Sequence, residues 1–198
     1  MEQNLLFADR DGNIQYVRTG RTPIRPEGDI NWSVPVPGGT DATRWLGIHS
    51  IDDLVQVKNP PQGYFQNCNV SPAVMMVDSP MTPDKYKKYI YNVLWDKNSP
   101  RGAQLVRLLD ADPSITKEEA IAYTLDNYDI LATPWQNALK AAVDAVGADR
   151  MNDPELAKAV NDILQWDGRY AKTSTAATLF KFWRLKSEDK VDIVAIAD

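Results

Sequence analysis

Proline recurs between residues 20 and 61 too closely for regular secondary structure. This stretch contains Pro23, Pro26, Pro35, Pro37, Pro60 and Pro61. Each proline lacks a backbone N–H and fixes φ, so we expect neither a central strand nor a long helix here. A long irregular segment inside a compact domain usually lines a site or packs as a defined loop. The sequence therefore predicts a first half built on ordered loops.

A β-hairpin precedes these loops. Asp11-Gly12-Asn13 is typical of a tight turn, because glycine tolerates positive φ and Asp or Asn side chains bond back to the backbone. Apolar and polar residues alternate after the turn, as in a returning strand. We expect a hairpin over Leu5–Tyr16. A further strand is expected at Gly63–Asn69, which the Ser71-Pro72 pair would end.

The composition changes near residue 100, after which alanine and leucine recur at helical spacing. Thr116 and Glu119 form a capping box, and we expect two further helices to open at Thr133-Pro134 and Asp153-Pro154. Gly147 should end the first of these. The second should bury Leu156, Val160, Ile163 and Leu164, and a fourth helix should carry Ala176, Ala177, Leu179, Phe180 and Trp183.

These patterns predict an α+β fold with two parts, strands and loops over residues 1–100 and helices over 101–198. The apolar ending Val194–Asp198 has no helix stop, so we expect the natural polypeptide to continue. The net charge of −5 disfavours a nucleic-acid surface. No apolar run approaches the roughly 20 residues of a membrane span, so we expect neither nucleic acid nor membrane as a partner.

Few residues of this chain can carry chemistry. Cys68 is the single cysteine and His49 the single histidine, which argues against a disulfide and a Cys/His zinc site. Their spacing matches no Cys–His nucleophile motif, so we interpret both as structural. Asn67 and Asn69 would share one face of the expected strand and could aim neutral N–H donors at a developing oxyanion. From the residues alone, a loop-bracing role for both asparagines, and a surface position for Arg101, are the simpler interpretations.

Several ordered motifs resemble the middle of the large subunit of penicillin acylases, a family related to the acyl-homoserine-lactone and aculeacin acylases. The resemblance is dense over residues 5–72, patchy over 101–110 and thin beyond. It rests on Ala8-Asp9, Asp11-Gly12-Asn13-Ile14, Tyr16, Thr19-Gly20, Pro23, Arg25, Val34–Gly38, Trp45-Leu46-Gly47, Asn59-Pro60, Gly63-Tyr64, Asn67-Cys68-Asn69, Ser71-Pro72, Arg101, Leu105, Arg107-Leu108-Leu109 and Trp166-Asp167-Gly168.

The resemblance implies an N-terminal nucleophile hydrolase with an αββα core, of which this chain is an internal segment. In such enzymes a serine exposed by self-cleavage attacks an amide, its own α-amino group acts as base, and no cofactor takes part in catalysis. By alignment, Asn69 is the oxyanion-hole asparagine and Arg101 the arginine that organises the site. Nothing in this chain matches the nucleophile motif, so we expect the chain alone to be inactive.

The resemblance also implies partners and surroundings. The partners would be the small subunit, the rest of the large subunit and a small-molecule N-acyl substrate. The family often binds a structural calcium ion, for which Asp78 is the candidate ligand in this chain, and it is commonly periplasmic or secreted. The alternative hypothesis is a catalytically dead, acylase-like binding domain in which the same motifs survive as scaffold.

Overall fold

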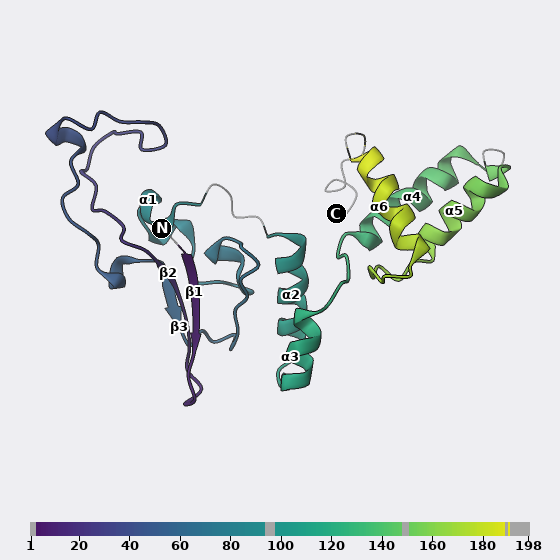
Figure 1. Ribbon diagram of the computed structural model, residues 1–198, viewed down its shortest axis with the longest axis horizontal. Helices are drawn as coiled ribbons and strands as arrows, with labels where there is room; N and C mark the ends of the chain where they lie inside the picture. Colours follow the sequence, from purple (N-terminus) through teal and green to yellow (C-terminus); the bar gives the residue numbers. More distant parts are fainter. Residues whose placement is uncertain (1–2, 94–97, 148–150, 189, 191–198) are drawn as a thin grey trace. The chain divides into compact units, whose positions relative to one another are not determined.

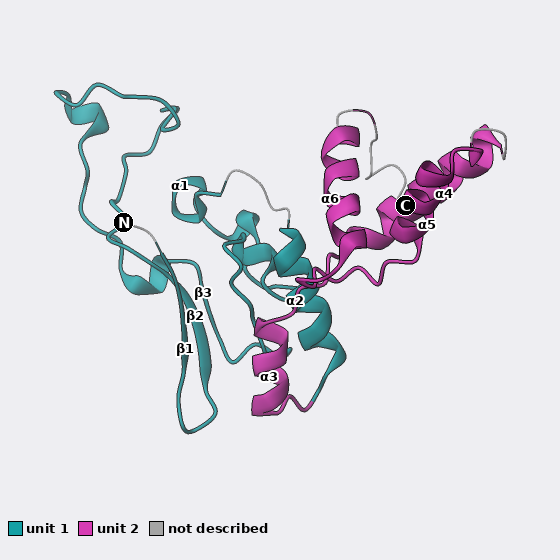
Figure 2. Cartoon of the chain, turned by 45° about the vertical axis from the view of Figure 1, so that its right-hand side comes forward, with its two compact units in different colours: residues 1–113 teal, residues 114–198 magenta. Residues whose placement is uncertain are grey.

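The structure, a computed structural model, describes residues 3–93, 98–147, 151–188 and 190. The chain divides into two compact units, Met1–Pro113 and Ser114–Asp198 (Figure 2). The first unit holds the strands and long loops, and the second is helical (Figure 1). The apolar ending Val194–Asp198 lies outside the described residues.

The predicted hairpin is confirmed. Strands β1 (Gln3–Ala8) and β2 (Ile14–Thr19) pair antiparallel, with Gln3 opposite Thr19 and Ala8 opposite Ile14. The Asp9 carboxylate closes the turn by accepting the N–H groups of Asp11 and Asn13, each at 2.9 Å. Gly12 has φ of 86°, a left-handed conformation that favours glycine.

The proline-rich segment forms ordered loops, as expected, and joins the sheet only at its end. Strand β3 (Gln56–Lys58) pairs antiparallel with β2, which gives the order β1-β2-β3. Single 3₁₀ turns occur at Asp41–Thr43 and Ile51–Asp53. One isolated bridge, Pro23 with Ile48, ties the two arms of the loop together. Because β3 is at an edge of this sheet, neighbouring prolines need not donate to a ladder.

The core of the first unit lies where β2 packs against loops and a short helix. Two more 3₁₀ turns (Pro72–Val74 and Pro83–Lys85) lead to helix α1 (Lys88–Tyr91), and helix α2 (Pro100–Ala111) follows. The buried core residues are Tyr16, Leu54, Val55, Met75, Met76, Met81, Ile90 and Tyr91. Flexible methionine side chains fill the irregular spaces that loops leave in such a core.

The strand predicted at Gly63–Asn69 is wrong, because this segment is irregular. Gly63 and Asn69 have φ of 74° and 59°, and left-handed residues cannot continue a strand. The Gly63 N–H bonds back to the Pro60 carbonyl in a turn. The backbone therefore curls instead of extending, and the face-sharing argument for Asn67 and Asn69 loses its original basis.

The second unit is helical, but it begins at Ser114 rather than at residue 101, so α2 belongs to the first unit. The helices of the second unit are α3 (Lys117–Thr124), α4 (Ala132–Val146), α5 (Pro154–Leu164) and α6 (Thr175–Ser187). The Thr116 capping box is present, Asp153 caps α5, and Gly147 ends α4 with φ of 77°. α4 begins at Ala132 rather than at Thr133-Pro134. Pro134 is still tolerated, because the first four N–H groups of a helix have no partner within it.

An aromatic core holds α4, α5 and α6 together. Its buried residues are Ala132, Trp135, Leu139, Ile163, Trp166, Ala177 and Phe180. Val160 and Leu164 pack against it, whereas Leu156 is 47% exposed, so the prediction that Leu156 is buried is wrong. Leu156 lies in the first turn of α5, whose buried residue Ile163 lies near the other end. Among the described residues, no helix is long and apolar enough to cross a membrane.

Candidate active-site segment

One buried glutamine anchors the loop that carries the predicted site. Gln66 is 2% exposed, and its backbone N–H donates to the Met75 carbonyl at 3.0 Å. Its Nε2 donates to the Val74 carbonyl at 3.3 Å, and its Oε1 accepts the Cys68 N–H at 2.7 Å. A buried amide with these bonds strongly restrains its loop, because breaking any of them would leave a polar group unsatisfied. The buried Gln66 side chain therefore fixes the start of the loop that leads to Asn69.

Asn69 follows this anchor in a left-handed conformation. Its φ is 59°, and its N–H donates to the Asn67 Oδ1 at 3.1 Å in an Asx turn. The side chain is exposed, and among the described residues its carboxamide makes no hydrogen bond. The Asn69 carboxamide is thus left with a neutral donor to offer to a ligand.

A polar cavity of about 340 Å³ lies beside Asn69 and is lined by Gln3, Asn4, Arg18, Asn67 and Asn69. Strands β1 and β2 supply the first three of these residues. Amide and guanidinium groups therefore surround the cavity, and no carboxylate lines it. Neutral and positive donors around one space favour a ligand that carries or develops negative charge. The two asparagines of the expected strand do meet at one cavity, through a turn rather than through a strand face.

Helix α2 places Arg101 against the same loop. Ser99 caps the helix by accepting the Gly102 N–H at 3.1 Å, and Pro100 occupies the first turn. The Arg101 Nη2 then donates to the Cys68 carbonyl at 3.3 Å. The structure thus brings the two sequence-predicted residues, Asn69 and Arg101, to one loop, with Arg101 bonded to the residue that precedes Asn69.

The family model described as penicillin amidase matches residues 1–192. The chain belongs to the penicillin amidase family. Members of this family are hydrolases, and the resemblance inferred from the motifs is thereby confirmed.

Two relatives show how much of such a protein the chain represents. Penicillin G acylase of Escherichia coli is 30% identical over 167 residues, which is 83% of this chain and 18% of that protein. A solved structure of thermostable penicillin G acylase from Alcaligenes faecalis is 26% identical with a TM-score of 0.62, over 96% of this chain and 33% of that one. The chain thus spans about a third or less of the length of these relatives.

Asp78, the candidate calcium ligand, lies away from other ligands. It is exposed with φ of 49°, and its carbonyl accepts the Gln62 Nε2 at 3.3 Å. No group of three or more His, Cys, Asp or Glu side chains that could hold a metal occurs among the described residues. Calcium needs six to eight oxygen ligands. Asp78 supplies one carboxylate, so the described residues do not form a calcium site on their own, and a role for Asp78 stays a prediction.

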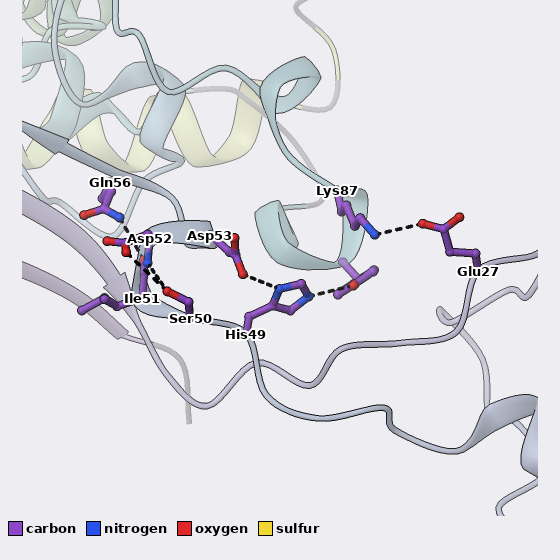
Figure 3. A network of polar contacts seen from close by, with 9 residues as sticks. Glu27, His49, Ser50, Ile51, Asp52, Asp53, Gln56 and Lys87 are labelled. Carbon is purple, nitrogen blue, oxygen red and sulfur yellow. Dashed lines mark hydrogen bonds and ion pairs between the residues drawn. The ribbon is translucent and has the colours of Figure 1, made fainter.

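His49 and Cys68 do not form a dyad. The His49 Nδ1 lies 3.0 Å from the Asp53 Oδ2 (Figure 3). Its Nε2 lies 2.9 Å from the Tyr89 hydroxyl. Both ring nitrogens are therefore engaged by other groups. The Cys68 N–H and carbonyl are bonded to Gln66 and Arg101. Both residues have structural partners, in keeping with their interpretation from the sequence.

Sequence reasoning missed Asn4 and Gln66. The Asn4 Nδ2 donates to the Asn67 Oδ1 at 3.0 Å, and the Asn4 Oδ1 accepts the Tyr16 hydroxyl at 2.7 Å. Burial raises the pKa of Tyr16, so this hydroxyl keeps its proton through the physiological range. No spacing rule connects Asn4 to Asn67, which lie 63 residues apart in sequence. The family motifs likewise begin after Asn4.

Proposed function

We propose that the whole protein containing this chain hydrolyses the amide bond of a small N-acyl substrate, and that Asn69 is its oxyanion donor. The serine nucleophile would lie outside this chain. Its hydroxyl oxygen would attack the amide carbonyl carbon while its proton moves, through the α-amino base, to the leaving amine. The C–N bond then breaks, and water hydrolyses the acyl ester to release the acid and restore the serine.

The observation that carries the proposal is the unbonded carboxamide of Asn69 beside a cavity without carboxylates. An oxyanion forms at the carbonyl oxygen during both acyl-transfer steps. A neutral donor held in place stabilises this charge without needing to reorganise as it develops. Asn69 meets this requirement, because an Asx turn restrains its backbone while its Nδ2 stays available. Membership of the penicillin amidase family supports the same assignment.

Arg101 would act through the loop rather than on the substrate. Its guanidinium donates to the carbonyl of the Cys68–Asn69 peptide. A shift of about 1 Å in a positioning element can lower turnover by about 10²-fold. The partners would be the small subunit and the remainder of the large subunit, and the location periplasmic or extracellular. Asp78 would contribute one oxygen to a structural calcium site completed elsewhere in the protein.

The test is Asn69→Ala in the whole, processed protein. Turnover of an N-acyl substrate should fall by about 10²–10³-fold, the usual effect of losing one oxyanion donor. KM should change little, because the lost bond forms mainly in the transition state. Asn152→Ala is the matched control, since Asn152 is an exposed asparagine of the second unit. Near-normal turnover in Asn69→Ala would remove Asn69 from the mechanism. A wild-type protein without hydrolytic activity would favour a binding role instead.

A further inference from the structure

A chain of hydrogen bonds runs from the buried core of the first unit to the backbone of Asn69. The Tyr16 hydroxyl, on a residue with no exposed surface, donates to the Asn4 Oδ1 at 2.7 Å. The Asn4 Nδ2 donates to the Asn67 Oδ1 at 3.0 Å. The same oxygen accepts the Asn69 N–H at 3.1 Å. The hairpin and the Asn69 loop are therefore connected through one side-chain oxygen.

We propose that Asn67 is a positioning residue for Asn69, and that Asn4 holds Asn67 in the orientation this requires. The inference rests on the proposed role of Asn69 as oxyanion donor and extends it. Asn67 lines the cavity, but in this role it would not itself stabilise the developing oxyanion. It would act by fixing the left-handed backbone from which the Asn69 carboxamide projects.

The conformation of Asn69 explains why such a brace is needed. Few residues other than glycine adopt φ of 59°, and asparagine adopts it mainly where local hydrogen bonds support it. The Asx turn from Asn67 is that support. Arg101 donates to the Cys68 carbonyl, which belongs to the same peptide group as the Asn69 N–H. The Cys68–Asn69 peptide is therefore restrained at both of its polar groups, the carbonyl by Arg101 and the N–H by Asn67.

The bonds to Asn67 also fix which end of its carboxamide faces the loop. A carboxamide can present either its oxygen or its NH₂ group, and an oxygen turned toward a developing anion would repel it. Two donors from different segments hold the Asn67 Oδ1, one from strand β1 and one from the loop. Without Asn4, one donor would remain, and rotation of the carboxamide would release the Asx turn. Asn4 thus acts on Asn69 indirectly, by orienting the Asn67 side chain.

The experiment is a double-mutant cycle in the whole, processed protein, with turnover normalised to titrated active sites. The variants are Asn67→Ala, Asn69→Ala and the double variant. Asn67→Ala alone should lower kcat by about 10- to 10²-fold with little change in KM, as expected for a displaced catalytic group. If Asn67 acts only through Asn69, adding Asn67→Ala to Asn69→Ala should cause little further loss. An equal further loss in the double variant would overturn the inference.

Asn67→Ser distinguishes positioning from direct contact. A serine hydroxyl can accept the N–H two residues on, although more weakly, but it has no NH₂ group. Serine should therefore retain more kcat than alanine if Asn67 braces the backbone. Equal losses in the two variants would count against the brace. Thermal melting of each variant checks that the fold is kept.

Asn4 is tested in the Tyr16→Phe variant, because replacing Asn4 alone would leave the buried Tyr16 hydroxyl without its acceptor. Tyr16→Phe alone keeps the Asn4–Asn67 bond and should have a small effect on kcat. Adding Asn4→Leu to Tyr16→Phe removes that bond and should lower kcat toward the Asn67→Ala value. No difference between these two variants would exclude a role for Asn4. Near-normal activity of Asn69→Ala would refute the oxyanion role of Asn69. A large loss in Asn69→Ala together with normal activity of Asn67→Ala would refute only the positioning role of Asn67.

Discussion

The Arg101 Nη2 lies 3.3 Å from the carbonyl oxygen of Cys68 and so contacts the peptide group that joins Cys68 to Asn69. This contact links the N-terminal turn of α2 to the segment that carries the proposed oxyanion donor. It depends on the Ser99 cap and Pro100, which together set where α2 begins. The position of Asn69 is thus coupled to the start of a helix that lies more than thirty residues later.

Replacing Arg101 with lysine in the whole protein should lower kcat by about 10-fold or more. Lysine keeps the charge but loses the planar fork that reaches the Cys68 carbonyl, so the loop would be less well held. The steady-state kcat and KM should be compared with those of Arg10→Lys, a change at the exposed hairpin turn. A larger effect on KM than on kcat would point to substrate contact rather than loop positioning.

Gly102→Ala should destabilise the first unit, although alanine normally favours a helix. A Cβ at Gly102 would overlap the Asn98 Oδ1 and lie 3.0 Å from the Gln66 Nε2 and 3.1 Å from the Val70 Cγ1. Both amides donate to the Val74 carbonyl, so moving them costs hydrogen bonds as well as space. We expect a loss of about 1–3 kcal/mol in unfolding free energy.

The measurement for Gly102→Ala is chemical denaturation of the 198-residue chain, followed by circular dichroism. Gly39→Ala serves as the control, because a Cβ there meets open space and its φ is not left-handed. Equal stability of the two variants would show that Asn98 and Gln66 adjust without cost.

Phe180→Ala should strongly destabilise the helical unit. Phe180 has no exposed surface, and its ring lies 4.6 Å from that of Trp166 and 6.1 Å from that of Trp183. Emptying such a site costs about 3–5 kcal/mol. Phe182→Ala, in the same helix but 65% exposed, should change stability by less than about 0.5 kcal/mol. Denaturation followed by tryptophan fluorescence reports on both, and similar losses would contradict the burial pattern.

Tyr170 should make stability fall at alkaline pH. Partial burial of the ring and the nearby Asp129 carboxylate, which accepts the tyrosine hydroxyl at 3.1 Å, raise the Tyr170 pKa from 10.0 to about 12. A raised pKa in the folded state gives a stability contribution that is complete below pH 10 and is lost as the pH rises to about 12. Tyrosinate absorbance should be followed as the pH is raised, in the wild-type protein and in Tyr170→Phe. The difference between the two titrations should show one group that ionises near pH 12. A midpoint near 10.0 would contradict this environment.

The purified 198-residue chain should not hydrolyse N-acyl substrates. The proposed mechanism needs an N-terminal serine and its α-amino group, and no motif of this chain matches that nucleophile. Product release should be assayed with the chain alone and with the whole protein as positive control. Hydrolysis by the chain at enzymatic rates would mean that the nucleophile lies within these 198 residues.

Local chemistry made several elements predictable. The Asp9–Asn13 turn, the Thr116 capping box and the Asp153 cap each depend on contacts within four residues. The Gly63–Asn69 strand failed for the converse reason. Its residue types are compatible with a strand, but bonds to Met75 and Val74 curl the segment, and neither bond is visible as a local pattern. The αββα layering, which is expected only of the whole protein, stays a prediction.

The sequence by itself determined the hairpin, the loop character of the proline-rich segment, the helices and, through ordered motifs, the family. These features follow from neighbouring residues or from the order of motifs along the chain. Only the tertiary structure decided what surrounds Asn69. Asn4 reaches Asn67 across 63 residues and Arg101 reaches Cys68 across 33. Hydrogen bonds over such separations depend on how the loops and α2 pack, which residue spacing does not encode.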